Sequence, residues 1–323
     1  MAGLLLAVSL LVGSVAPVAA EEPRRASDDL SVGIRLVDAP VSRREDNRAH
    51  RYIIDHIKPA EQIRRRIAVT NLSDTRHRVR LYPAAAAVHK DGFTFAPGRR
   101  GNELTRWVTL EHSELVLEPD ETATVWTEIT VAKDATGGEH YGVIWAEISP
   151  KRDPSQQVHH VARAGVRIYL SVGPGGEPRS DFRIEDLTGA RAKNGVPVVT
   201  ARVKNTGGRA LDLTGKLTLS HGPGGVSAGP FNVQAVTVGP GRSAPATTSL
   251  DPRLPDGAWT AQLTLASGLV TRETSGRISI GTPQSARRGG GNSRMAMVTV
   301  GSLVSVAATA VLAYAYRRRS HSR

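Results

Sequence analysis

The feature that most constrains this chain lies near its C-terminus. Residues 295–316, MAMVTVGSLVSVAATAVLAYAY, carry no charged side chain. Because a helix rises about 1.5 Å per residue, a helix of this length just crosses a hydrocarbon core of about 30 Å. A buried helix of a globular domain is the alternative, but such helices usually keep one polar face. The sequence therefore predicts a transmembrane helix at 295–316 and a basic cytoplasmic tail at 317–323.

A second apolar run occupies the N-terminus. Leu4–Val18 has the length of a signal-peptide core and ends in small residues before Glu21. Residues 1–20 are therefore predicted to be a signal peptide. No basic residue comes before this run, which leaves open whether Met1 is the true start. An export signal followed by a single span predicts a single-pass protein of the cell membrane, with the region between the two segments outside the cell and the tail in the cytoplasm.

The region between these segments has the pattern of an all-β protein. Glycine (32) and proline (19) are abundant, and short alternating apolar runs are separated by turn residues. Short strands at regular spacing are typical of immunoglobulin-like sandwiches. The absence of cysteine excludes disulfides and thiolate metal sites. The predicted fold class is all-β, with two immunoglobulin-like β-sandwich domains followed by one transmembrane α-helix.

An internal repeat sets the predicted domain boundaries. Three landmarks recur in the same order in the two halves: Val69–Ser73 and Val203–Gly207, Leu117–Asp120 and Val238–Gly241, Gly138–Tyr141 and Gly257–Trp259. Two copies of one sandwich unit explain this order most simply. We expect domains at 28–173 and 177–281, with a flexible linker at 282–294 before the span.

The formal net charge of +12 raises the question of an anionic partner. The export signal argues against nucleic acid and favours wall polymers. A hairpin is predicted across Ile63–Tyr82, with one face in a core and the other a basic stripe. This stripe consists of Arg64, Arg66, Arg78 and Arg80. Guanidinium groups suit carboxylates and phosphates, although arginines on strands also serve solubility and discourage edge pairing. Trp107, in an arginine-rich approach, is the candidate for stacking on a sugar, with a core position as the alternative.

No catalytic or metal-binding pattern is present. His159 and His160 are adjacent and would point to opposite faces of a strand. The His-Glu-x-x-His, Gly-x-Ser-x-Gly and P-loop motifs are absent. We therefore expect a protein that is not an enzyme and that needs no cofactor or metal. A wall hydrolase or peptidase whose site is assembled from distant loops is the alternative that a linear scan does not detect.

The first half of the chain resembles the peptidoglycan-binding domain of the WxL-interacting protein family of Gram-positive bacteria, over roughly residues 31–173. The matching stretches are Gly33–Leu36, Tyr52–Ile53, Ile57–Ala60, Ile67–Ser73, Leu117–Glu121 and Gly138–Trp145. The order of export signal, two β-domains, single span and basic tail is also similar, in an actinobacterial-type surface protein. The resemblance implies that the first domain binds peptidoglycan. It also implies that the second domain engages surface WxL proteins or host ligands, although this domain is shorter than the family's and does not clearly match it.

These observations lead to three hypotheses. The first is a non-catalytic, membrane-anchored surface protein that binds peptidoglycan or an associated anionic wall polymer. The second is a surface scaffold that binds another exported protein through its β-domains, by strand addition or face packing. The third is the enzyme described above. Loss of salt-dependent wall binding with retained protein pull-down would favour the second hypothesis, and hydrolysis of labelled peptidoglycan would favour the third.

Overall fold

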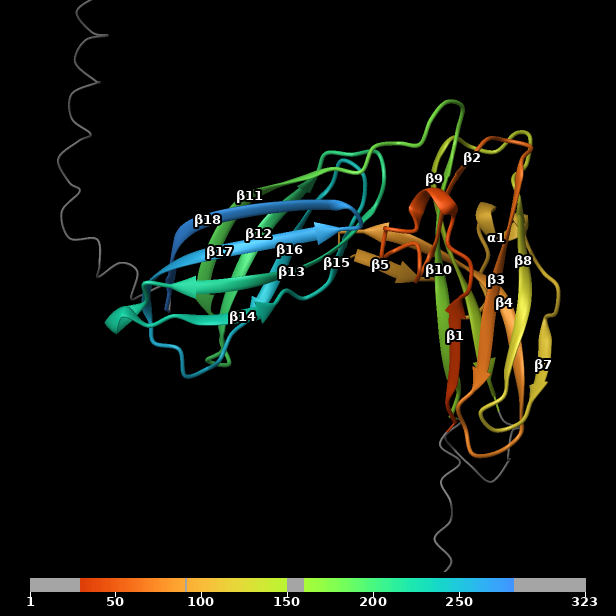
Figure 1. Ribbon diagram of the computed structural model, residues 1–323, viewed down its shortest axis with the longest axis horizontal. Coiled ribbons are helices and arrows are strands. Elements are labelled where there is room, and N and C mark those ends of the chain that lie inside the picture. The colour runs from red at the N-terminus through yellow and green to blue at the C-terminus, as the bar shows by residue number, and fades with distance from the viewer. Residues whose placement is uncertain (1–29, 91, 150–159, 282–323) are drawn as a thin grey trace, which may run out of the picture.

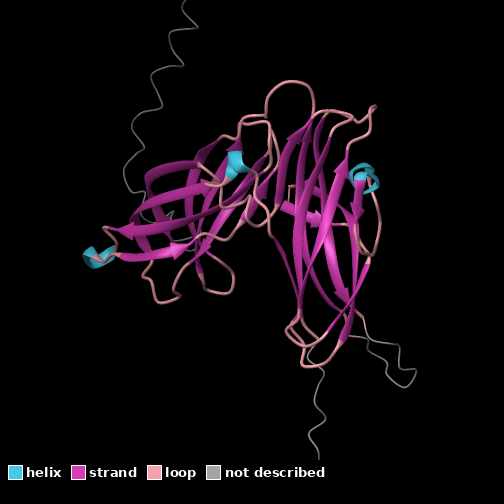
Figure 2. Ribbon diagram, turned by 45° about the vertical axis from the view of Figure 1, so that its right-hand side comes forward, coloured by secondary structure: helices cyan, strands magenta, loops and turns pink. Residues whose placement is uncertain are grey.

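Two β-sandwiches make up the part of the chain that the computed structural model describes, residues 30–90, 92–149 and 160–281. Their strands run at a steep angle to one another, and one end of the second sandwich abuts a face of the first (Figures 1 and 2). No helix among the described residues is long and apolar enough to span a bilayer. The predicted signal peptide, the span at 295–316 and the tail all lie outside those residues.

The first sandwich is built from two sheets. The first sheet has the order β1-β3-β8-β6, with β1 (Val32–Leu36), β3 (Gln62–Asn71), β8 (Thr122–Thr130) and β6 (Val108–Leu110). The second has the order β2-β10-β9-β4-β5, with β2 (Ile53–Ile57), β10 (Ala162–Val172), β9 (Gly138–Ile148), β4 (His77–His89) and β5 (Gly92–Phe95); β7 (Glu114–Leu117) also pairs with β4. A 3-10 turn (Val41–Arg43) and the short helix α1 (Glu103–Trp107) lie in the connections.

The second sandwich repeats this plan. One sheet has the order β11-β12-β16, with β11 (Phe182–Arg191), β12 (Pro197–Asn205) and β16 (Ser243–Ser249). The other has the order β14-β13-β17-β18, with β14 (Ala228–Asn232), β13 (Leu211–Ser220), β17 (Gly257–Ser267) and β18 (Val270–Ile280); β15 (Val236–Val238) pairs with β13. A 3-10 turn at Pro223–Gly225 follows β13.

The sheet orders are immunoglobulin-like. If β1, β3, β4, β6, β8, β9 and β10 are called A to G in chain order, the first sandwich packs an A-B-E-D sheet against a G-F-C sheet. The second sandwich places β11-β12-β16 against β18-β17-β13 in the same way. Each sandwich has its own apolar core, one around Ile67 and Ile144 and one around Leu217 and Trp259. The all-β, immunoglobulin-like prediction is therefore confirmed for the described residues.

Buried asparagines occupy equivalent places in the two sandwiches. Asn71 is fully buried, and its side-chain amide donates to the carbonyl oxygens of Thr75 (2.8 Å) and Leu117 (3.1 Å). Asn205, also fully buried, donates to Arg209 (2.7 Å) and Val238 (2.9 Å) in the same pattern. Each asparagine is the last residue of a strand in one sheet, and it bonds both the connection that follows and the last residue of a short strand in the other sheet. The landmarks Val69–Ser73 and Val203–Gly207 thus mark the same structural position.

The predicted hairpin across Ile63–Tyr82 is wrong. β3 pairs with β1 and β8, whereas β4 pairs with β9, β7 and β5, so the two strands belong to different sheets. The connection between them crosses from one sheet to the other through the loop that Asn71 organises. A short turn between two alternating runs is also compatible with such a crossing. The basic stripe is therefore divided between the two outer faces of the sandwich.

Candidate binding face on the first sandwich

The four arginines of the predicted stripe lie on two separate surfaces. On β3, Arg66 binds Asp38 (2.6 Å), and Arg64 lies 3.6 Å from Glu128. Their guanidinium groups flank the ring of Trp126, with Arg64 4.7 Å from its centroid and Arg66 5.5 Å. On β4, in the other sheet, Arg78 pairs with Glu114 and Arg80 lies 3.5 Å from Glu147. The single polymer-binding stripe predicted from the sequence is not formed.

Trp107 lies in the first core. It closes α1, is only 6% exposed, and its ring centroid is 4.8 Å from that of His140. The helix begins at Asn102, whose side chain accepts from the Thr105 backbone N–H (3.1 Å) and so caps it. This turn directs the indole inward. The ring is therefore not available for stacking on a sugar.

A different surface gathers aromatic and arginine side chains. It is the outer face of the β10-β9-β4 sheet, on the side of the sheet away from the core. In register across the strands, Tyr82 of β4 lies opposite Trp145 of β9, which lies opposite Gly165 of β10. A Cβ atom at Gly165 would approach the Trp145 ring to 2.6 Å, so the glycine leaves room for the indole to lie flat on the sheet. Phe95 of β5 meets the same indole at 4.8 Å between centroids.

Arginines cover these rings. Arg163 lies 4.2 Å above the Trp145 ring, Arg99 lies 4.2 Å above Tyr82, and Arg167 lies 4.7 Å from the Phe93 centroid. Stacking of this kind attracts a guanidinium to the negative face of the ring and holds its plane. Arg99 and Arg163 stay exposed and Arg167 is half-buried, so all three have donor edges near solvent. We call this set of three arginines and the rings beneath them the arginine–aromatic face.

Glu147 is a carboxylate in the middle of the face. It accepts a hydrogen bond from the Tyr82 hydroxyl (2.5 Å) and lies 3.5 Å from both Arg80 and Arg99. Burial, followed by the hydrogen bond to Glu147, raises the pKa of Tyr82, so this phenol remains a donor. One carboxylate therefore fixes the positions of two cations and leaves the face with an excess of positive charge.

Of the predicted residues, only Arg80 adjoins this face. A sequence signal for it exists in the stretch Tyr141–Ile148, which is apolar at both odd and even positions, a pattern typical of a strand in the middle of a packed sheet. In the structure this stretch lies in β9, the central strand between β10 and β4. The arginines above it come from a neighbouring strand and from the connection after β5, so only the folded chain brings them to Trp145.

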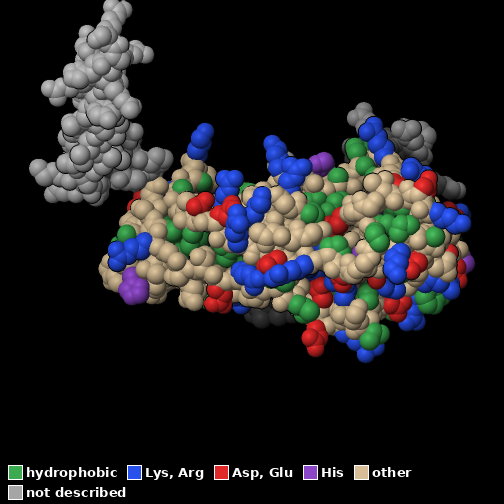
Figure 3. Space-filling view, turned by 90° about the horizontal axis from the view of Figure 1, so that it is seen from above, with side chains coloured by type: hydrophobic (Ala, Val, Ile, Leu, Met, Phe, Trp, Pro, Cys, Tyr) green, Lys and Arg blue, Asp and Glu red, His purple; other side chains and the backbone are tan. Residues whose placement is uncertain are grey.

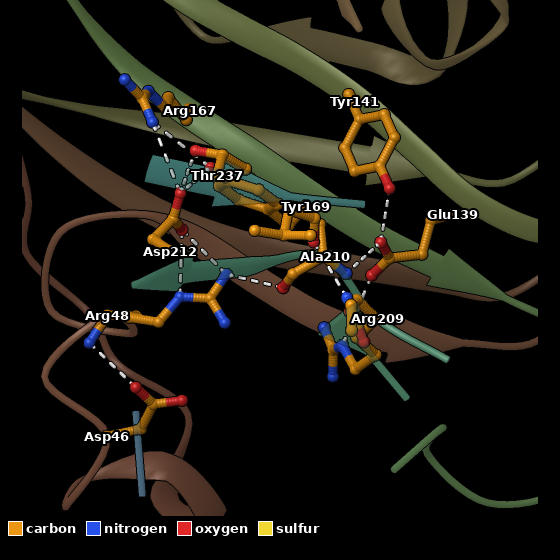
Figure 4. Close-up of polar contacts among 12 residues, drawn as sticks. Asp46, Arg48, Glu139, Tyr141, Arg167, Tyr169, Arg209, Ala210, Asp212 and Thr237 are labelled. Atoms are coloured by element: carbon orange, nitrogen blue, oxygen red, sulfur yellow. Dashed lines mark hydrogen bonds and ion pairs between the residues drawn. The ribbon is translucent and has the colours of Figure 1, made fainter. Parts of the chain in front are cut away.

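The second sandwich covers the adjoining part of the same sheet face. Asp212 of β13 sits against β10 and accepts from the Tyr169 hydroxyl (2.9 Å), the Thr237 hydroxyl (2.6 Å) and Arg48 Nε (3.0 Å), as Figure 4 shows. Arg167 lies 3.6 Å from the same carboxylate. Burial raises the pKa of Tyr169, which keeps its hydroxyl protonated as a donor. Asp212 therefore joins three side chains of the first sandwich to the second.

A second polar contact across the interface is made by an arginine of the second sandwich. Arg209, 2% exposed, extends from the second sandwich to lie 3.6 Å from Glu139 and also pairs with Glu177 between the domains. The other Glu139 oxygen accepts from the Tyr141 hydroxyl and the Ala210 N–H, each at 2.6 Å. Charges this deeply buried need partners. The interface is therefore a network of mutually dependent polar groups, which holds the two sandwiches in one orientation.

Charge elsewhere is more evenly mixed. Seen from above, lysine and arginine side chains are spread over both sandwiches with aspartate and glutamate between them (Figure 3). Within residues 30–281, as far as they are described, no group of three or more histidine, aspartate and glutamate side chains is placed to hold a metal ion. The arginine–aromatic face therefore differs from the rest of the surface in the stacking of its arginines on aromatic rings, and not in its charge alone.

Comparison with known proteins gives only distant likenesses. No family model matches the chain, and no curated protein matches it. Among solved structures, the YadV chaperone is 10% identical and covers 77% of this chain and 100% of its own, with a TM-score of 0.40. The Escherichia coli chaperone DraB is 12% identical, covering 76% and 98%, with a TM-score of 0.39. The Salmonella enterica SafA pilin–SafB chaperone complex is 10% identical, covering 76% and 96%, also at 0.39. At these values the likeness carries no conclusion about function.

Proposed function

We propose that this chain is a non-catalytic cell-surface protein, anchored in the membrane by the span predicted at 295–316, whose first sandwich binds peptidoglycan or an associated anionic wall polymer. The observation that carries the proposal is the arginine–aromatic face, where Arg99, Arg163 and Arg167 lie on the rings of one sheet. The predicted export signal, which would place this face outside the cell, and the family resemblance of residues 31–173 also support it.

The chemistry of the face suits a polyanion. A guanidinium held over a ring loses less freedom on binding, and its N–H groups remain available to a carboxylate or phosphate. Phe95, 39% exposed beside Trp145, supplies an apolar ring edge for the carbon face of a sugar. A repeating anionic glycan offers both kinds of group along one strand. The face thus combines charge with a nonpolar contact, which a merely solvated surface does not.

The test is co-sedimentation of the full chain, in detergent micelles, with purified peptidoglycan sacculi across a salt series. The face variant Arg99→Gln/Arg163→Gln is compared with the control Arg64→Gln/Arg66→Gln, which removes the same charge from the opposite sheet. We expect binding that weakens with salt and is lost in the face variant but kept in the control. Equal loss of binding in both variants would mean that net charge alone explains the interaction and that the face is not the site. No pelleting of the unaltered chain at low salt would refute the proposal.

One observation favours the scaffold as a second candidate function. β2 pairs with β10 only from Ile168 to Val172, and no described strand pairs with Ala162–Arg167 on the side away from β9. An edge of this kind can accept an added strand from another protein. Because the chain has no cysteine, a photo-crosslinker can be attached at Ala162→Cys on whole cells, with Ser275→Cys on β18 as the matched site. Crosslinking from Ala162 alone, unaffected by the Arg99/Arg163 changes, would favour the scaffold.

A further inference from the structure

A cavity of about 610 Å³ lies between the two sandwiches. The segment after the first 3-10 turn forms one wall, the second sandwich forms the opposite wall, and Arg167 of β10 reaches in from the side. The Asp212–Arg48 pair is part of its lining, in the network of Figure 4. Cavities of this size hold small ligands, whereas an extended polymer strand needs an open groove. The cavity adjoins the arginine–aromatic face because Arg167 belongs to both.

The lining of the cavity is positively charged. Three arginines, Arg48, Arg51 and Arg167, line it together with one carboxylate, Asp212. Arg48 bonds this carboxylate through both Nε (3.0 Å) and Nη2 (2.9 Å), so this pair is close to neutral. Arg51 is exposed, and within the described part of the chain no carboxylate lies within ion-pair distance of it. Arg51 and Arg167 are therefore the cations with donors left for an incoming anion.

The second sandwich also contributes small apolar side chains to the lining. Ala235, Val236 and Ala266 lie there together with the polar residues Thr214, Thr237 and Asp212. A ligand seated here meets guanidinium groups on one side and these aliphatic side chains on the other. A simple inorganic anion would leave the aliphatic side chains in contact with water, whereas an anionic group on a compact organic framework would cover them.

We propose that this cavity binds the carboxylate of an acidic sugar about the size of one glycan unit, with Arg51 as the principal anchor and Ala235 as the nonpolar contact. The inference rests on the proposed function in one respect, because such a ligand would be an acidic unit of the same wall glycan. The arginine–aromatic face would then hold the polymer along its length while the cavity recognises one carboxylate within it.

The test uses two sugars that differ in a carboxylate. N-acetylmuramic acid is N-acetylglucosamine with a lactyl group attached, so the pair isolates the anion. Saturation-transfer NMR with the full chain in detergent micelles should show binding of N-acetylmuramic acid and much weaker binding of N-acetylglucosamine. Arg51→Gln should weaken the acidic sugar roughly tenfold, as expected for loss of a charged hydrogen bond. Ala235→Trp, at an exposed position, should block the cavity without a change of charge.

Arg76→Gln is the matched control, because Arg76 is 65% exposed and pairs with Glu118 away from the cavity. Equal binding of the two sugars, or N-acetylmuramic acid binding that survives both Arg51→Gln and Ala235→Trp, would overturn the inference. Sacculus pelleting of the same variants separates the two proposals. Pelleting lost only in Arg99→Gln/Arg163→Gln, together with sugar binding lost only in Arg51→Gln, would support both proposals. If the unaltered chain pellets with sacculi but does not bind N-acetylmuramic acid, only the inference about the cavity is refuted. If it binds the sugar but does not pellet, only the proposed function is refuted.

Discussion

The two sandwiches share a fold but differ on one outer face. On β9 the side chains directed away from the core include Tyr141, Val143 and Trp145, whereas the equivalent strand β17 carries Thr260, Gln262 and Thr264. Both strands bury their other face in a core of similar aliphatic composition. The immunoglobulin-like topology therefore constrains only the side chains of each strand that point into the core. The side chains that point outward are free to differ, and in the first sandwich they include the rings on which the arginines stack.

The difference also explains how the two units fit together. The second sandwich does not pack core to core with the first. It places Asp212 against Tyr169 of the aromatic sheet, where Ala210 also packs, and Arg209 against Glu139. The remaining part of that sheet, around Trp145, stays open under its arginines. One face thus serves both as the domain interface and as the candidate site. Four predictions test this division of roles.

The largest effect is expected at the interface. Asp212→Ala removes the carboxylate that joins Arg48, Tyr169 and Thr237, and leaves the Arg48 charge buried without its partner. Breaking a buried pair in this way costs about 3–5 kcal/mol of unfolding free energy. Denaturant unfolding should show this loss, while Asp186→Ala at an exposed position of β11 should stay within about 0.5 kcal/mol. A loss under about 1 kcal/mol for Asp212→Ala would mean that the interface does not couple the sandwiches.

The buried asparagines provide the next test, since they are the closest correspondence between the two units. Asn71→Ala and Asn205→Ala each remove a buried amide and leave backbone carbonyls unpaired. We expect a loss of about 2–3 kcal/mol for each, from several buried hydrogen bonds. Thermal and denaturant unfolding of the two variants should give similar losses. An effect confined to one variant would show that the repeat is a likeness of sequence and not of structural role.

These asparagines also show what the sequence can and cannot reveal. The Val-x-Asn landmark is local, so its repetition correctly indicates two equivalent sandwiches. Strand pairing is not local: the runs around Arg64 and Arg80 alternate correctly, yet they belong to different sheets because the connection at Asn71 crosses the sandwich. The position of Trp107 is likewise not evident from the sequence, because a five-residue helix capped by Asn102 turns its side chain into the core.

The candidate face is harder to predict for a related reason. The apolar pattern of Tyr141–Ile148 correctly predicts a central strand, but it does not distinguish a second buried face from a surface covered by arginines. Arg99 and Arg163 are far apart in the sequence and meet Glu147 or Trp145 only after the sheet forms. Gly165 looks like an ordinary weak point of a strand, although its lack of a side chain is what lets Trp145 lie flat. Such contacts depend on register between strands, which no linear pattern specifies.

A pair of glycines at comparable places tests this contact directly. Gly165 of β10 and Gly276 of β18 lie in the last strand of each sandwich. An added Cβ meets the Trp145 ring at 2.6 Å in the first case and has open space in the second. Gly165→Ala should therefore destabilise by about 1–3 kcal/mol, and Gly276→Ala should be neutral or stabilise by up to about 1 kcal/mol. A change in tryptophan fluorescence, caused by movement of the Trp145 ring, should accompany Gly165→Ala and not Gly276→Ala. Similar effects at the two positions would contradict the flat placement of the indole.

The smallest effect concerns pH and a carboxylate on the opposite sheet of the first sandwich. Hydrogen bonds from Arg66 hold the pKa of Asp38 below its usual 3.8. A carboxyl whose folded-state pKa is lowered adds stability that is present above the unfolded value and is lost as the pH falls through the folded one. Asp38→Asn should thus destabilise by at most about 1 kcal/mol at pH 7, because the pair is solvent-screened. The difference from the unaltered chain should shrink as the pH falls below about 4.

The second sandwich offers a matched carboxylate for this measurement. Asp251 bonds Arg253, two residues along the chain, and this arginine holds the pKa of Asp251 at about 2. Because the two residues are neighbours in sequence, their contact also forms in the unfolded chain, which reduces its share in folding stability. Asp251→Asn should therefore leave the pH dependence of unfolding nearly unchanged, while Asp38→Asn, whose partner lies on β3 and is positioned only by folding, alters it. The same pH slope in both variants would show that distance along the chain does not decide the contribution of these surface pairs.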